Sequence, residues 1–391
     1  MANNKNTKVP NVPNSTDRGN VIRNVPALRF PEFEGEWKKE QLGDTADFSK
    51  GAGISKEQLS EKGEPCILYG ELYTKYKSEV IYDIISKTDI DSTKLVRSQA
   101  NDVIIPSSGE TAEDIATARC VLKNNILLGG DLNIIRLHKH SGSFMSYQLN
   151  GKRKYDIAKV AQGVSVVHLY AEHLKGVNTY NPCMEEQEKI ARLLSLLDER
   201  IATQNKIIER YESLIRGIAQ NIARNNQPNV LLSECLECSS STLQESDICE
   251  NGTYPVYGAN GIVGYFDDYS TEDEAVHIIK DGSGVGTVSY VTGKCSATGT
   301  LNTLQAKDGY LLQYLYYMLK VFNFEPYKTG MAIPHIYFKD YGKAKIFCPS
   351  YTEQLKYVEL LSAIDNKLSV EQRILTNLSL QKQYLLRQMF I

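Results

Sequence analysis

The stretch that decides the fold runs from Gly163 to Arg200 and reads GVSVVHLYAEHLKGVNTYNPCMEEQEKIARLLSLLDER. It returns in outline at 330–367, as GMAIPHIYFKDYGKAKIFCPSYTEQLKYVELLSAIDNK, after a constant shift of 167 positions. The matching residues are Gly163 and Gly330, His168 and His335, Tyr170 and Tyr337, Pro182 and Pro349, Glu186-Gln187 and Glu353-Gln354, Leu194 and Leu361, and Asp198 and Asp365. An ungapped repeat of this length indicates an internal duplication, so each half is expected to form an equivalent structural unit.

Each copy leads into a long helix with a hydrophobic seam. Seam residues alternate at spacings of four and three over more than four heptads, which is typical of a coiled coil. The first seam comprises Ile190, Leu194, Leu197, Ile201, Gln204, Ile208, Tyr211, Ile215, Ile218 and Ile222. The second comprises Tyr357, Leu361, Ile364, Leu368, Glu371, Leu375, Leu378, Lys382, Leu385 and Met389. Gln204 and Glu371 are matching polar interruptions, and a polar seam residue can fix the register of two helices.

Both helices are expected to begin just after a proline. Ser350 and Glu353 match a capping box, whereas Cys183 and Glu186 keep only its acidic half. Each helix could pack onto its own domain, but the two stripes are longer and more regular than a short local contact needs. At 1.5 Å per residue, forty residues make a rod of roughly 60 Å. The sequence therefore favours two helices that pack together and hold two globular domains apart.

Composition sets the broad class of protein. A chain of 391 residues is too long for one ordinary core, so two domains are expected. No run approaches 18 apolar residues and the N-terminus has no hydrophobic signal core, which predicts a cytoplasmic protein. The net charge of −3 does not favour general nucleic-acid binding. Phosphate contacts would need a local basic patch, such as the one from 138–140 through 152–154.

Neither a metal site nor a catalytic motif stands out. The eight cysteines form no paired framework, which suits a reducing compartment. Cys235 and Cys238 make one C-x-x-C without a second pair, so buried side chains are favoured over a zinc site. The P-loop, H-E-x-x-H and G-x-S-x-G motifs are all missing from the sequence. Gly282–Gly286 is glycine-rich without dinucleotide-binding spacing, and we predict no cofactor.

Five segments follow from these patterns. They are a disordered Asn-rich arm at 1–25, a first globular domain at 26–182, a first long helix at 183–225, a second globular domain at 226–349 and a second long helix at 350–391. Strands are expected at Cys66–Tyr69, Val103–Ile105, Ile126–Leu128, Asn133–Leu137, Tyr254–Tyr257, Ala275–Ile279 and Val288–Val291. A tyrosine-rich helix is expected at Leu311–Leu319.

The duplicated pattern of glycine, histidine five residues later, proline, and Glu-Gln opening a heptad helix resembles the specificity subunit of type I restriction-modification systems. The resemblance covers nearly all of residues 26–391. It implies an α+β fold in which two mixed α/β target-recognition domains are separated by two long helices, packed as an antiparallel coiled coil with pseudo-twofold symmetry. It also implies that each domain reads one half of a split double-stranded DNA site and that the helices act as a ruler. Catalysis would belong to methylation subunits, which bind S-adenosylmethionine, and to ATP-using restriction subunits, so this chain would be no enzyme.

Two loops that follow strands are the predicted DNA readers. Short hydroxyl side chains and glycines allow close approach to a groove, and Lys280 suits a phosphate or a guanine edge. Tight turns would use the same residue types, so that alternative stays open for each residue. The DNA-binding candidates are Ser107, Ser108, Gly109, Glu110 and Thr111 in the first loop, Lys280, Asp281, Gly282, Ser283, Gly284 and Thr287 in the second, and Lys152 and Arg153 in the basic patch. The two loops differ, which predicts an asymmetric target.

Partner binding is expected along the helices and at their junctions. The subunit-facing candidates are the linker 225–230 and the helix starts Glu186, Gln187, Glu353 and Gln354, together with the seam residues Leu194, Leu197, Ile201, Ile208, Leu361, Ile364, Leu368 and Leu375. His168 and His335 sit between apolar residues, which favours a structural role.

Two other classes of protein stay open. A coiled-coil adaptor that binds only proteins would show the same seams, but would have no reason for glycine-rich strand-end loops in both halves. A single-chain DNA methyltransferase would need an S-adenosylmethionine site, and none is recognisable in the sequence.

Overall fold

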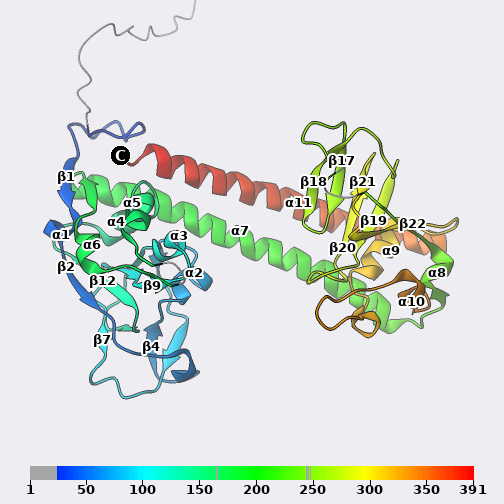
Figure 1. The fold of residues 1–391 in the computed structure, drawn as a ribbon, viewed down its shortest axis with the longest axis horizontal. Helices are drawn as coiled ribbons and strands as arrows, with labels where there is room; N and C mark the ends of the chain where they lie inside the picture. The colour runs from blue at the N-terminus through cyan, green and yellow to red at the C-terminus, as the bar shows by residue number, and fades with distance from the viewer. Residues whose placement is uncertain (1–23, 164–165, 244–245, 247) are drawn as a thin grey trace, which may run out of the picture. The chain divides into compact units, whose positions relative to one another are not determined.

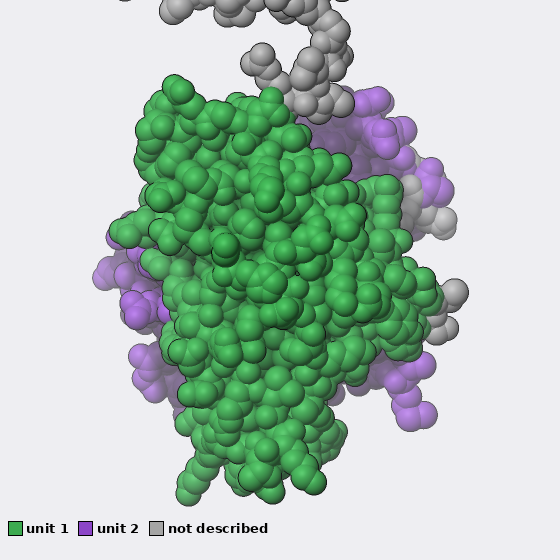
Figure 2. Space-filling view, turned by 90° about the vertical axis from the view of Figure 1, so that its left-hand side faces the viewer, with its two compact units in different colours: residues 1–201, 378–391 green, residues 202–377 purple. Residues whose placement is uncertain are grey.

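The computed structural model describes residues 24–163, 166–243, 246 and 248–391, and it divides into two compact units (Figure 2). Unit 1 comprises residues 1–201 and 378–391, and unit 2 comprises residues 202–377. The expected N-terminal arm lies outside the described residues, except for Asn24 and Val25. Within the described ranges, no helix is both long enough and apolar enough to cross a membrane.

Unit 1 contains two five-stranded sheets (Figure 1). The central strand of the first is β8, Asp102–Pro106, and all five of its residues are buried. Val103 and Ile105 enter one hydrophobic cluster while Ile104 enters another, as the alternation of side chains along a strand requires. The first sheet has the order β2 (Ala46–Lys50), β12 (Leu132–Leu137), β8, β10 (Arg119–Val121), β5 (Val80–Ile81). The second has the order β3 (Leu59–Ser60), β6 (Ser86–Thr88), β4 (Glu64–Ile67), β11 (Leu127–Leu128), β7 (Val96–Arg97).

Unit 2 repeats the frame of the first sheet. Its four-stranded sheet has the order β16 (Leu236–Ser240), β22 (Leu301–Ala306), β19 (Glu274–Ile279), β20 (Val288–Thr292), so β19 takes the place of β8. A three-stranded sheet has the order β18 (Gly261–Phe266), β17 (Tyr254–Gly258), β21 (Ser296–Ala297). The helices α4 (Gly142–Asn150) and α9 (Leu312–Leu319) pack on equivalent strands of the two frames. The duplication therefore extends beyond the repeated segment. The tyrosine-rich helix and six of the seven predicted strands are confirmed, whereas the strand predicted at Cys66–Tyr69 lies two residues earlier, as β4.

A short two-stranded sheet closes each frame just before its long helix. In unit 1, β1 (Lys38–Gln41) pairs antiparallel with β14 (Asn178–Asn181). In unit 2, β15 (Val230–Leu231) pairs antiparallel with β23 (Lys345–Ile346). Asn178 and Lys345, which pair with Gln41 and Leu231, differ by the same 167 positions as the sequence repeat. Each long helix is thus anchored at its start to the first strand of the same frame.

The long helices are α7, Met184–Asn225, and α11, Tyr351–Gln388, and both contribute to the core of each unit. In unit 1 the buried cluster joins Ile190, Leu194 and Leu197 of α7 to Leu378, Leu385 and Met389 of α11, with Trp37, Phe144 and Tyr147 from the globular part. In unit 2 it joins Ile208, Ile215 and Ile222 of α7 to Leu361 and Leu368 of α11, with Tyr314, Leu315 and Tyr317 of α9. The coiled-coil seam is therefore confirmed, and the same side chains also pack on the globular domains.

The two polar interruptions of the seam meet inside unit 2. The side-chain amide of Gln204 donates hydrogen bonds to the backbone carbonyl of Glu371, at 3.1 Å, and to its carboxylate. Within unit 2, the two helix segments that carry these duplicated residues run antiparallel (Figure 1).

Unit 1 carries a buried ion cluster that the repeat does not predict. The ammonium of Lys382 lies 2.5 Å from Oε2 of Glu79 and 2.6 Å from Oδ1 of Asp198. The hydroxyls of Ser78 and Tyr147 donate to Oδ2 of Asp198, at 2.9 and 2.8 Å. Burial raises the pKa of Glu79 above its usual range, and the neighbouring Lys382 limits that rise.

Candidate nucleic-acid interface

The first predicted reading loop leaves the central strand of unit 1. Ser107 is buried; its backbone amide donates to the carbonyl of Asp131 at 2.7 Å, and its own carbonyl accepts from Leu169 at 3.0 Å. Ser108 and Gly109 form the short strand β9, which pairs antiparallel with β13, Val167–His168. The loop is thus held by the segment that carries the repeated histidine.

The loop then turns into helix α3, Ala112–Ile115. Thr111 caps this helix, since its hydroxyl accepts from the amide of Asp114 at 3.1 Å and donates to the Asp114 carboxylate at 2.7 Å. Glu110 and Thr111 are exposed, whereas Ser108 and Gly109 are half-buried. Of the five candidates in this loop, the two at the helix start are therefore the most accessible to a ligand.

The second predicted reading loop leaves β19, the equivalent strand of unit 2. Asp281 forms a backbone bridge with His335, and its carboxylate lies 2.5 Å from Nδ1 of that histidine. Gly282 has φ +92°, a conformation that glycine adopts without strain, and its amide donates to the carbonyl of Pro334 at 3.0 Å. Lys280 and Gly284 are half-buried, and Ser283 and Thr287 are exposed. This loop is also tied to the repeated segment.

The two loops therefore hold equivalent positions in a duplicated frame. Ser108 lies opposite His168, and Asp281 lies opposite His335. His168 also bridges to Gln162 and His335 to Thr329, so each repeated segment folds back on itself in the same way. These contacts involve the backbone alone; the side chain of His168 is exposed and that of His335 is half-buried, so the structural role of the two histidines stays a prediction. The pairing of His335 with the carboxylate of Asp281 was not predicted, because no local pattern links residues 54 positions apart.

The two DNA-binding candidates of the basic patch differ from each other in accessibility. Lys152 is exposed. The guanidinium of Arg153 donates to the carbonyl of Ile391 at 2.9 Å, forms an ion pair with Asp156 at 3.1 Å and lies over the ring of Tyr180. Arg153 is thus engaged inside unit 1, which leaves Lys152 as the accessible cation of this pair.

Three of the side chains predicted to face a partner subunit are buried, those of Glu186, Gln187 and Gln354. The carboxylate of Glu186 accepts two hydrogen bonds from Arg29 at 2.8 Å and one from Trp37 at 3.3 Å. Those partners precede it by about 150 residues, so the helix start looked exposed in the sequence.

The duplicated glutamines perform the same structural task in the two units. Gln187 accepts from the backbone amide of Ser141, at the start of α4, and donates to the carbonyl of Pro182. Gln354 accepts from the backbone amide of Leu311, at the start of α9, and donates to the carbonyl of Pro349. Each glutamine therefore satisfies one backbone donor at a helix start and one carbonyl before its own helix.

The other helix candidates lie along the seam or at the helix start. Glu353 is exposed, and its carboxylate accepts from the amide and hydroxyl of Ser350, at 3.3 and 2.8 Å. This forms the acidic half of the predicted capping box, whereas the amide of Glu353 donates to the backbone carbonyl of Ser350 and not to its hydroxyl. The buried seam residues are Leu194, Leu197, Ile208, Leu361 and Leu368, and the half-buried ones are Ile201, Ile364 and Leu375. Among the described residues, no group of histidine, cysteine and carboxylate side chains could hold a metal ion.

A family model for the type I restriction modification DNA specificity domain matches residues 34–213 and 232–380. These two matches cover most of the chain, one in each half, and the chain belongs to this family.

Curated relatives match over shorter stretches. The type I restriction enzyme EcoprrI specificity subunit of Escherichia coli is 28% identical over 116 residues, 30% of this chain and 29% of that protein. The type I restriction enzyme MjaVIII specificity subunit of Methanocaldococcus jannaschii is 24% identical over 205 residues, 51% of this chain and 44% of that protein. The chain thus matches less than half the length of either relative.

Solved structures match over nearly the whole chain. The type I restriction-modification S subunit from M. genitalium has a TM-score of 0.66 at 19% identity, covering 94% of this chain and 99% of that one. A chain from the type I R-M system, solved in work on complex assembly and conformational transition, has a TM-score of 0.50 at 16% identity, covering 90% and 97%. At these identities the likeness shows the fold, and it agrees with the predicted α+β class.

Proposed function

We propose that this chain is the sequence-specific DNA-recognition subunit of a type I restriction-modification complex. In this proposal it reads a bipartite, asymmetric site in double-stranded DNA and directs adenine methylation or cleavage by partner methylation and restriction subunits. The observation that carries the proposal is the pair of unlike loops at equivalent positions of a duplicated frame. A frame that repeats while its loops differ is the arrangement expected for reading two different half-sites.

The chemistry of the two loops supports an asymmetric target. The first offers Ser108, Glu110 and Thr111, whose oxygens can accept from a base amino group such as that of cytosine. The second adds the cation of Lys280, which can donate to guanine acceptors or to a phosphate. We therefore expect the first loop to select base donors and the second to select base acceptors.

An exposed apolar face of α11 supports partner binding through the helices. Within unit 2, Leu355, Leu360, Val370 and Ile374 are 38–51% exposed, although the seam of the same helix is packed. Several large apolar side chains exposed along one helix are typical of a protein-interaction surface. We propose that this face, in place of Glu186, Gln187 and Gln354, contacts a methylation subunit.

Binding to mixed-sequence DNA tests the proposal. The chain alone and the chain with its methylation subunit are titrated against a pool of duplexes in filter binding, and the methylated adenines are mapped by sequencing. We expect tighter binding by the complex and methylation at one split site. A complex that forms but neither binds nor methylates DNA would contradict the proposal and favour a protein-only scaffold.

A further inference from the structure

Both units expose apolar and aromatic side chains at the same points of the repeated segment. In unit 1, Val166 is 52% and Tyr170 is 45% exposed; their duplicates in unit 2, Ile333 and Tyr337, are 57% and 47% exposed. Met331 in unit 2 is fully exposed. We call these the Val166–Tyr170 surface and the Met331–Tyr337 surface. Exposure of the same side-chain types twice, at one sequence shift, indicates a shared task and not a local accident.

Each surface is joined by backbone hydrogen bonds to a loop predicted to read DNA. In unit 1, the amide of Leu169 donates to the carbonyl of Ser107 at 3.0 Å. In unit 2, the amide of Ile336 donates to the carbonyl of Lys280 at 2.9 Å. The exposed tyrosine follows one residue later in both cases. A duplex held against either loop therefore comes within reach of the neighbouring tyrosine.

Imidazole or ammonium groups lie beside both tyrosines. The ring of Tyr170 lies 6.2 Å from the ring of His168 and 5.6 Å from that of His173. The ammonium of Lys339 lies 5.2 Å from the ring centre of Tyr337. A tyrosine hydroxyl beside an imidazole or an ammonium suits a phosphate oxygen, because each of these groups can donate a hydrogen bond. The branched side chain of Val166 or Ile333 offers apolar contact to an adjacent sugar.

We propose that the Val166–Tyr170 and Met331–Tyr337 surfaces are equivalent, sequence-independent contacts to the DNA backbone, and that they position the two reading loops. The inference rests on the proposed function. It is based on a difference between adjacent segments: the two surfaces carry the same residue, tyrosine, at positions 170 and 337, whereas the reading loops beside them differ in sequence. Sugar and phosphate are the parts of DNA that both half-sites share, so a shared surface belongs against them.

The test uses the full chain with its methylation subunit and the variants Tyr170→Ala, Tyr337→Ala and the double variant. Tyr82→Ala and Tyr265→Ala are matched controls, because they remove tyrosines that are 39% and 38% exposed, one in each unit and neither on α11. We expect Tyr170→Ala and Tyr337→Ala each to weaken DNA binding roughly three- to tenfold, the loss of about one hydrogen bond with its packing. The factor should be the same for the cognate site and for mixed-sequence duplexes, and the methylated sequence should not change.

Other outcomes would overturn the inference in distinct ways. A changed methylated sequence would make these tyrosines base readers. Unchanged DNA binding with failed assembly would make the surface a contact for the methylation subunit. If wild type and variants bind DNA equally and the wild type methylates a split site, this inference is wrong and the proposed function is retained. Failure of the assembled wild type to bind DNA would remove the proposed function itself, and this inference with it. Thermal melting of each variant shows whether a loss of binding comes from unfolding.

Discussion

Replacing Lys382 with methionine probes how unit 1 is held together. The ammonium of Lys382 lies 2.5 Å from the carboxylate of Glu79 and 2.6 Å from that of Asp198. Lys382 takes the seam position that Ile215, its counterpart in the first copy, fills with an apolar side chain. The side chains of Lys382, Glu79 and Asp198 are only 15%, 10% and 6% exposed, so water cannot take the place of the lost cation. Removing one partner of a buried ion pair costs about 3–5 kcal/mol, and we expect a loss of that size at neutral pH.

The stability lost in Lys382→Met should depend on pH, and the raised pKa of Glu79 sets the direction of that dependence. Burial already raises the pKa of Glu79 above its ordinary value of 4.5, and Lys382 opposes that rise, so the variant should raise the pKa of Glu79 further. A carboxyl whose folded pKa exceeds its unfolded pKa binds its proton more firmly in the native state. Stability is then lost as pH rises from about 4.5 through the folded pKa, and regained as pH falls. Relative to wild type, the variant should therefore lose less unfolding free energy at pH 5 than at pH 8.

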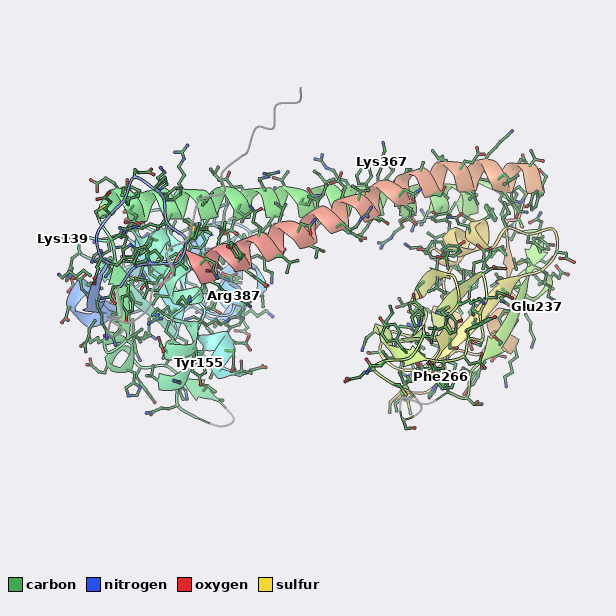
Figure 3. The ribbon with its side chains drawn as sticks, turned by 90° about the horizontal axis from the view of Figure 1, so that it is seen from above. Lys139, Tyr155, Glu237, Phe266, Lys367 and Arg387 are labelled. Atoms are coloured by element: carbon green, nitrogen blue, oxygen red, sulfur yellow. The ribbon has the colours of Figure 1, made fainter. Side chains whose placement is uncertain are left out.

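Urea unfolding followed by tryptophan fluorescence measures this effect. Trp37 is the chain's single tryptophan and lies in the same buried cluster as Leu378 and Leu385, so its signal reports on unit 1. Lys367→Met, at an exposed lysine on the unit 2 part of α11, is the matched control (Figure 3). Adding Glu79→Gln to the variant should recover part of the stability at pH 8. Equal losses at pH 5 and pH 8, or a loss within about 0.5 kcal/mol of the control, would refute the reasoning.

Three further predictions concern recognition and assembly. Methylation mapping should give two different half-sites, because the loops at 106–111 and 280–287 offer different donors and acceptors; a palindromic target contradicts this. Replacing Leu194 and Leu361 by aspartate places a charge in each buried cluster at a cost of several kcal/mol; a double variant that still assembles a fully active complex counts against the seam. Seven residues can be inserted after Ile201 and again after Asn377, where the chain passes from one unit to the other. Each insertion adds about 10 Å of helix and keeps the heptad phase. Since DNA rises about 3.4 Å per base pair, the DNA spacer between the half-sites should lengthen by about three base pairs with each half-site unchanged; an unaltered spacer would show that helix length does not set the spacing.

The long helices were predictable because their signal is local and repeated. A 3.5-residue period over more than four heptads indicates a helix whatever surrounds it, and α7 and α11 follow it closely. The buried strand β8 was also predictable, since its run of branched side chains is typical of a strand covered on both faces.

The environment of single side chains was harder to predict, because it depends on partners far away in the sequence. Glu186 carries the signature of an exposed helix start, yet Arg29 and Trp37 bury it. Lys382 occupies an apolar seam position, and Glu79 is 303 residues away. The same limit applies to the reading loops, whose positions could be proposed from the strands before them but whose backbone partners could not.

The contact between Gln204 and Glu371 has a consequence for how the chain pairs with itself. An amide facing a carboxylate is a donor facing an acceptor, whereas two copies of the second helix would bring two glutamates together at that point. Two copies of the first helix would put Ile215 where Lys382 now neutralises Asp198. The two seams are therefore more complementary to each other than either is to a copy of itself, which favours pairing of the two different halves within one chain over pairing of like halves.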